Sequence, residues 1–182
     1  DNRLWSRAFR RRLDAESVHD AILVVSGRLK EVHGGPTFPG TLAADYGYAP
    51  DETTRAVFIP VFRNALPEFF DLFDFADTSV VTGKRNAATV APQALYMLNH
   101  PFVMEQARAA AGRFLKAEPD ASARVDSIYV SALGRPASPS ERKLALDFLA
   151  ETQKAAKPMK DEEAWGMLIQ AVFASPDFRS ID

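Results

Sequence analysis

The chain has no cysteine among its 182 residues. Disulfide bonds, thiolate metal ligands, cysteine nucleophiles and a CxxCH haem attachment are therefore excluded. No apolar run approaches the ~20 residues of a membrane-spanning helix, so we expect no membrane insertion. An excess of one charge is also lacking, because 22 basic residues face 24 acidic ones and the net charge is −2. We expect no nucleic-acid partner, since domains that bind nucleic acid usually carry a basic excess.

Patterns typical of catalysis are equally scarce. The three histidines, His19, His33 and His100, have no metal-ligand spacing to one another, and HExxH and GxSxG are absent. We interpret His19 as a surface residue beside Asp20, and His100 as part of a turn between two helices. No cofactor is expected, and whether the chain is an enzyme stays open.

The sequence contains the periodicity of a helical protein. Apolar residues recur at helical spacing before residue 30 and again from residue 92 onward. We predict a mainly α fold, a bundle of about six helices with a long irregular loop and at most a small two-stranded β element. We expect residues 1–182 to form a single domain. It divides into an N-terminal helical segment (1–32), an irregular centre with a short strand (33–91) and a helical bundle (92–182).

Several helix ends are marked by local chemistry. Asp14 is expected to cap the first helix, and Pro101 suits the first turn of a later one. Residues 138–141, Ser-Pro-Ser-Glu, form a capping box in which serine and glutamate each bond the other's backbone N–H. Gly134 is expected to end the preceding helix in a left-handed conformation.

The irregular centre carries the most unusual local sequence. Residues 33–54 hold three prolines and four glycines, which predict a long loop. The apolar run 56–62, AVFIPVF, is the best strand candidate, and Pro60 restricts it to an edge strand. Its expected partner is residues 79–82 or part of the preceding loop, and a short helix is expected over 67–73.

Acidic, basic and aromatic residues interleave in residues 58–103. Asp71, Asp74 and Asp77 are spaced by three, which on a helix stacks carboxylates that repel unless a cation or basic groups intervene. One hypothesis is a divalent-cation or polar-ligand site; the other is a structural network in which Arg63 or Arg85 pairs with Asp74 or Asp77. The phenylalanines of this region are interpreted first as core and second as the wall of a pocket. The candidate ligand-binding residues are Arg63, Asn64, Asp74, Arg85 and Gln93, and the weak metal candidates are Asp71, Asp74 and Asp77.

Six ordered segments give the chain a resemblance to a known family. They are RRRLDAESVHDAILVVSGRL, a GGP loop, VFIPVFRNALPEFFDLFDFAD, GKRNAATVAPQALYMLNHPFV, RVDSIYVSALGRPASPSE and AWGMLIQAVFASPDF. In this order they resemble the C-terminal region of the planctomycete-type family called domain of unknown function 1553. The resemblance implies that the chain, which begins with Asp1, is the last part of a large exported protein, periplasmic or at the cell surface. Such proteins often carry a planctomycete cytochrome c domain, so any haem would sit on another domain.

Two functional hypotheses follow, and the resemblance implies no catalytic residue for either. The first is a non-catalytic structural or interaction module of an exported multi-domain protein. Its partner would be the missing N-terminal portion of the same polypeptide or another exported protein. The basic run Arg7, Arg10, Arg11 and Arg12 is interpreted as a solvated face or an inter-domain contact. The alternative is a ligand-binding or enzymatic domain that acts on carbohydrate, or binds a cation, through residues 58–103.

Overall fold

The chain is mainly helical, as its sequence predicts, in the part that the structure describes. The computed structural model describes residues 10–31, 35–36, 38, 40–41, 48, 50–85, 91–155 and 157–181. Within these residues lie α1 (Ala15–Ser26), α2 (Glu68–Leu72), α3 (Ala91–Asn99), α4 (Pro101–Ala117), α5 (Ala121–Leu133), α6 (Pro139–Lys154) and α7 (Asp161–Ala174), with short 3₁₀ helices η1 (Ala56–Phe58) and η2 (Asp177–Arg179). Of these described helices, none is both long and apolar enough to cross a lipid bilayer.

The helix ends follow the predicted capping chemistry. The Asp14 side chain accepts a hydrogen bond from the Ser17 N–H at 2.9 Å and so caps α1. Both bonds of the capping box are present at α6, where Ser138 accepts from the Glu141 N–H and Glu141 accepts from the Ser138 N–H. Gly134 ends α5 with φ at 70°. These ends depend on contacts within a few residues, which is why the sequence predicts them.

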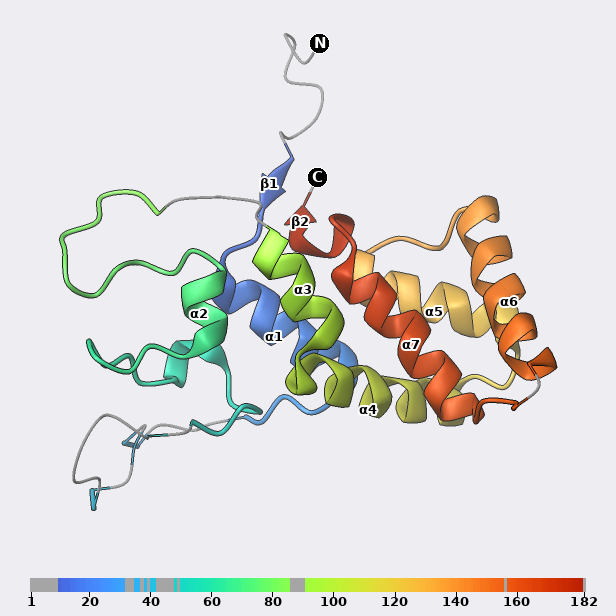
Figure 1. Ribbon diagram of the computed structural model, residues 1–182, viewed down its shortest axis with the longest axis horizontal. Coiled ribbons are helices and arrows are strands. Elements are labelled where there is room, and N and C mark those ends of the chain that lie inside the picture. The colour runs from blue at the N-terminus through green and yellow to red at the C-terminus, as the bar shows by residue number, and fades with distance from the viewer. Residues whose placement is uncertain are drawn as a thin grey trace, which may run out of the picture.

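Helices α4 and α7 form the centre of the molecule. They cross each other closely, and α1 packs against another side of α4 (Figure 1). The helices are in direct contact at Gly166 of α7, where an added methyl group would lie 3.4 Å from Cγ of Arg108 on α4. The fully buried side chains of these helices include Ile22 and Leu23 in α1, Val103, Ala110 and Ala111 in α4, and Ile169 and Phe173 in α7.

The small sheet is present, but the predicted strand over 56–62 is wrong. The two strands are β1 (Arg11–Arg12) and β2 (Ser180–Ile181), which pair antiparallel and bring the two ends of the described chain together (Figure 1). Residues 56–58 form η1, and residues 79–82 form no strand. The reason is a contact that the sequence could not reveal: the Ala56 N–H donates to the Asp20 carboxylate of α1 at 2.7 Å, in place of a strand partner.

Helix α6 lies at one end of the molecule, beside α5 and α7 (Figure 1). Only Ala145 of its sixteen residues is buried. Leu146 and Leu149 pack partly buried against the core, and ion pairs add to this attachment. Arg142 donates to both carboxylate oxygens of Asp126 on α5, at 2.6 and 2.8 Å. Arg135, which follows α5, donates to both oxygens of Glu141 at 2.8 Å each.

Candidate functional site

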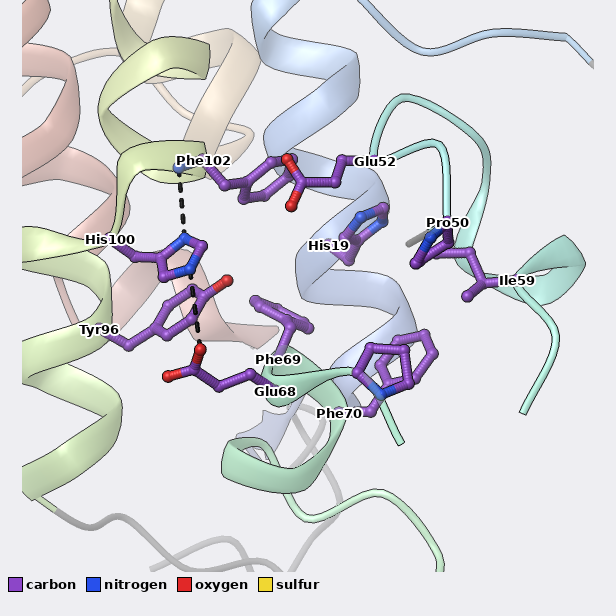
Figure 2. A pocket seen from close by; sticks show the side chains of 11 residues that line it. His19, Pro50, Glu52, Ile59, Glu68, Phe69, Phe70, Tyr96, His100 and Phe102 are labelled. Atoms are coloured by element: carbon purple, nitrogen blue, oxygen red, sulfur yellow. Dashed lines mark hydrogen bonds and ion pairs between the residues drawn. The ribbon is translucent and has the colours of Figure 1, made fainter. Parts of the chain in front are cut away.

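Residues 58–103 do contribute to a pocket, but with polar side chains other than those predicted. The pocket has a volume of about 200 Å³ and lies where α1, α2 and α3 meet the start of α4 and the loop that follows residue 50 (Figure 2). Most of its wall is aromatic or apolar. The lining residues are His19, Pro50, Glu52, Ile59, Pro67, Glu68, Phe69, Phe70, Tyr96, His100 and Phe102.

His100 shapes one side of the pocket from the junction of α3 and α4. It lies between the two helices, which confirms the predicted turn, and its Nδ1 accepts the Phe102 N–H at 3.2 Å. Its ring stacks on Tyr96, one helical turn earlier, with ring centres 4.1 Å apart. Its Nε2 lies 3.9 Å from the Glu68 carboxylate of α2. The turn therefore places an imidazole, a phenol and a carboxylate on one wall.

His19 forms the opposite side, and its interpretation as a surface residue is wrong. The residue is 4% exposed and stacks on Phe102 with ring centres 5.2 Å apart. Phe69 meets it edge-on at 5.6 Å. Burial lowers the pKa of His19 below its ordinary value, although Asp20 and Glu52 act in the opposite direction. The imidazole is therefore held in its neutral form at neutral pH.

The electrostatic character of the pocket comes from two carboxylates. Burial raises the pKa of the Tyr96 hydroxyl well above its ordinary value, and the negative charges of Glu52 and Glu68 raise it further. The hydroxyl is therefore protonated at neutral pH and interacts electrostatically with both carboxylates. No lysine or arginine belongs to the described lining. The pocket thus combines aromatic walls, two neutral polar groups and acidic side chains.

The predicted cation site has no matching cluster in the described part of the chain. There, no group of three or more His, Asp or Glu side chains could hold a metal ion. Asp71 is exposed on α2, whereas Asp74 follows that helix with φ at 60°. Asp77 lies further along the loop and accepts the Ser79 N–H at 2.7 Å. The spacing of three does not stack them, because the helix ends before Asp74.

Two predicted ligand residues, Asp74 and Gln93, instead take part in an internal clasp with Arg12. Gln93 is fully buried, and its amide donates to the Leu72 carbonyl at 2.7 Å and approaches Asp74 at 3.4 Å. Arg12 of β1 donates to the Gln93 oxygen at 2.5 Å and lies 3.6 Å from the Asp74 carboxylate. This clasp joins β1, α3 and the end of α2. The interpretation of the basic run as solvated is therefore wrong for Arg12.

The predicted pairing of Arg63 or Arg85 with Asp74 or Asp77 is wrong. Arg85 donates to both oxygens of Glu16 on α1, at 2.8 and 2.7 Å, and its guanidinium lies 4.6 Å from the centre of the Phe75 ring. Arg63 and Asn64 lie in an exposed turn, where neither has a hydrogen bond or ion pair to another described residue. Pairing depends on the course of the loop, which brings Arg85 to the start of α1. These residues do not converge.

A second hollow is an apolar groove of about 610 Å³ between α6 and α7. Tyr129 and Leu133 of α5 contribute to it, and Leu98 continues it from the end of α3. Leu144 is 72% exposed, Leu98 51% and Met167 46%. Arg135 and Arg10 pair with the groove's two acidic residues, Glu141 and Asp177, so its rim is close to neutral. Below, this hollow is called the α6–α7 groove.

The sequence analysis assigned none of the pocket residues His19, Glu68, Tyr96 and His100 to a site. Tyr96 and His100 are four residues apart, so a helix ending at the turn must bring their rings together; this spacing was a usable signal. His19 offered none, because Phe102 and Phe69, which cover it, are remote in sequence. His33 lies outside the described residues.

A family model described as PSD1, "Protein of unknown function (DUF1553)", matches residues 1–149. No curated protein and no solved structure matches the chain. The matched range ends within α6, so α7 lies beyond it although α7 packs against α4 at the centre of the fold.

Proposed function

The chain belongs to the DUF1553 family of proteins of unknown function, and we propose that it acts as a non-catalytic interaction module through the α6–α7 groove. The observation that supports this proposal is the exposed apolar surface of the groove, to which Leu144 of α6 and Met167 of α7 contribute. An amphipathic helix of a folded protein normally buries its apolar stripe. In α6, Ala145 is buried and Leu146 and Leu149 pack partly buried against the core, while Leu144 is largely exposed and lines the groove.

The shape and charge of the groove favour a helix as its occupant. Two neighbouring helices, α6 and α7, form its walls, and such a pair accepts the apolar face of a third helix. The carboxylates at its rim already have arginine partners. A partner that brings apolar side chains therefore leaves no buried charge unpaired.

The occupant that we propose is an apolar helix from an upstream part of a longer polypeptide. Arg10 precedes β1 and donates to Asp177 at 2.5 Å, and Asp177 lines the groove. Arg10 thus lies beside one end of the groove. A helix supplied in cis would reach it at high effective concentration.

Hydrogen exchange on the full-length polypeptide and on residues 1–182 alone tests the proposal. We expect the amides of α6 to exchange more slowly in the full-length polypeptide. Leu144→Glu should remove this difference without unfolding the chain, because Leu144 is 72% exposed. Val130→Glu is the matched control, since Val130 is a 51% exposed apolar residue of α5 outside the groove lining.

Equal exchange of α6 in both polypeptides would overturn the proposal, and so would equal effects of the two variants. Residues 1–182 could instead self-associate, and Leu144→Glu could abolish this association. That result would identify a second copy as the occupant and would overturn the proposal that a helix of the same polypeptide fills the groove. Sedimentation equilibrium over a range of concentrations detects this outcome.

The family resemblance also supports a proposal about location, namely that the full-length polypeptide is exported to the periplasm or the cell surface. Fractionation of the producing cells, followed by protease treatment of intact cells, measures this directly. Recovery in the cytoplasmic fraction would contradict it.

A further inference from the structure

Two largely buried polar side chains, Tyr96 and His19, line the pocket of Figure 2. Tyr96 is only 8% exposed, yet its hydroxyl makes no hydrogen bond to any other described residue. Figure 2 shows this hydroxyl pointing away from α3 toward the middle of the pocket. The side chain of His19 is 6% exposed; its Nδ1 lies 3.4 Å from Asp20, and its Nε2 has no partner in the described chain.

The hydroxyl and the ring nitrogen can each form a hydrogen bond with a molecule in the pocket. They come from α3 and α1 and line the same hollow. The site is therefore built of two buried polar side chains as well as an apolar cavity.

The size of the pocket limits what it can hold. Its volume of about 200 Å³ lies below the roughly 300 Å³ at which pockets for drug-sized ligands begin. The ligand must therefore be a small molecule or a single protruding group.

The charges and rings limit the chemistry. Glu52 and Glu68 disfavour an anion, and no basic side chain in the described lining offsets them. Phe69, Tyr96 and Phe102 supply aromatic surface, and aromatic faces attract cations. Together these are the elements of an aromatic cage with carboxylates at its edge.

We propose that this pocket binds a small organic cation, an ammonium group carrying methyl or short alkyl substituents. The aromatic faces would contact the alkyl substituents, and Glu52 and Glu68 would balance the charge. The Tyr96 hydroxyl and His19 Nε2 would accept hydrogen bonds from any N–H or hydroxyl that the ligand carries. This binding role is separate from docking at the α6–α7 groove, because the two sites share no lining residue.

The test uses choline and its uncharged analogue of the same shape, 3,3-dimethylbutan-1-ol. Each is titrated into the protein while the NMR resonances of the His19 and His100 rings are followed. We expect choline to shift both rings and to bind at least tenfold more tightly than the alcohol, because only choline interacts with the carboxylates and the ring faces as a cation. Acetate and glucose serve as the anionic and sugar probes.

Variants locate the binding. Glu68→Gln should weaken choline binding about threefold and the double variant Glu52→Gln/Glu68→Gln about tenfold, as expected for exposed carboxylates near a cation. Glu68 is a suitable site for substitution, since its side chain is 69% exposed. Glu151→Gln, an exposed glutamate of α6 outside the pocket, is the matched control and should change nothing.

Three outcomes would overturn the proposal. Equal affinity for choline and the alcohol would show an apolar pocket without preference for charge. Binding of glucose alone would assign the pocket to sugars. Absence of any shift at His19 and His100, in a protein whose thermal melting is intact, would show that the pocket binds none of these molecules.

Discussion

Helices α6 and α7 are similar in length but differ in how they are held. α7 has fourteen residues and buries Trp165, Ile169 and Phe173 among others, whereas α6 has sixteen and buries only Ala145. α6 has the better local signals, with a complete capping box, while the start of α7 has no side-chain cap. Strong local specification thus makes a helix form, but it does not determine whether the rest of the chain covers that helix.

Removal of α7 should have the largest effect. A chain that ends at residue 149, the limit of the family match, lacks α7. It would expose the face of α4 that packs against α7, including side chains that are now fully buried. We expect this chain to show no cooperative thermal transition in circular dichroism. A cooperative melt close to that of residues 1–182 would contradict the central role of α7.

Point substitutions should reproduce the contrast on a smaller scale. Phe173→Ala removes a fully buried ring of α7 and should lower the free energy of unfolding by about 3–5 kcal/mol. Leu144→Ala on α6 should change it by less than about 0.5 kcal/mol, as at most exposed sites. Urea titration of both variants measures the difference, and comparable losses would mean that α6 is packed as tightly as α7.

Polar contacts allow the same comparison. The contacts of buried Gln93 with Arg12 and Leu72 can be set against the more exposed ion pair between Arg142 of α6 and Asp126. Gln93→Ala removes the donor to the Leu72 carbonyl and the acceptor for Arg12 at a fully buried position, so we expect the free energy of unfolding to fall by about 2 kcal/mol. Arg142→Ala breaks the ion pair between Arg142 and Asp126, whose side chains are each about one-third exposed. We expect this variant to lower the free energy of unfolding by less than about 1 kcal/mol. A lower urea midpoint for Arg142→Ala than for Gln93→Ala would show that the contacts of Gln93 contribute little to stability.

The smallest effect concerns pH and the start of α6. Hydrogen bonds from Arg135 hold the pKa of Glu141 at about 2, below its ordinary value of 4.5. The folded state therefore binds this proton less readily than the unfolded chain. Its stabilising contribution is complete above pH 4.5 and is lost as the pH falls toward 2.

Glu141→Gln removes this titration. We expect the fall in melting temperature between pH 4.5 and 2 to be shallower in the variant than in the wild type, because the other carboxylates titrate in both. Glu151→Gln, which alters an exposed glutamate of the same helix, should retain the wild-type slope. Identical slopes for all three proteins would show that Glu141 does not contribute.

The candidate site was predictable only in part. The sequence points to residues 58–103, and Glu68, Phe69, Tyr96 and His100 of the pocket lie there. It also points to Asp74 and Gln93, which in the structure contact an arginine of β1 that is remote in sequence. Which groups remain available to a ligand depends on which ones the fold has already paired.

By itself the sequence determines the helical class and the helix ends of this protein. Periodicity, Asp14, Gly134 and the capping box at Ser138 act within one or two turns, and each is present as predicted. Only the tertiary structure decides that His19 is buried, that Arg85 pairs with Glu16, and that β1 pairs with β2. The physical reason is distance along the chain: capping energies are local, whereas burial and ion pairing depend on segments that meet only after the helices have packed.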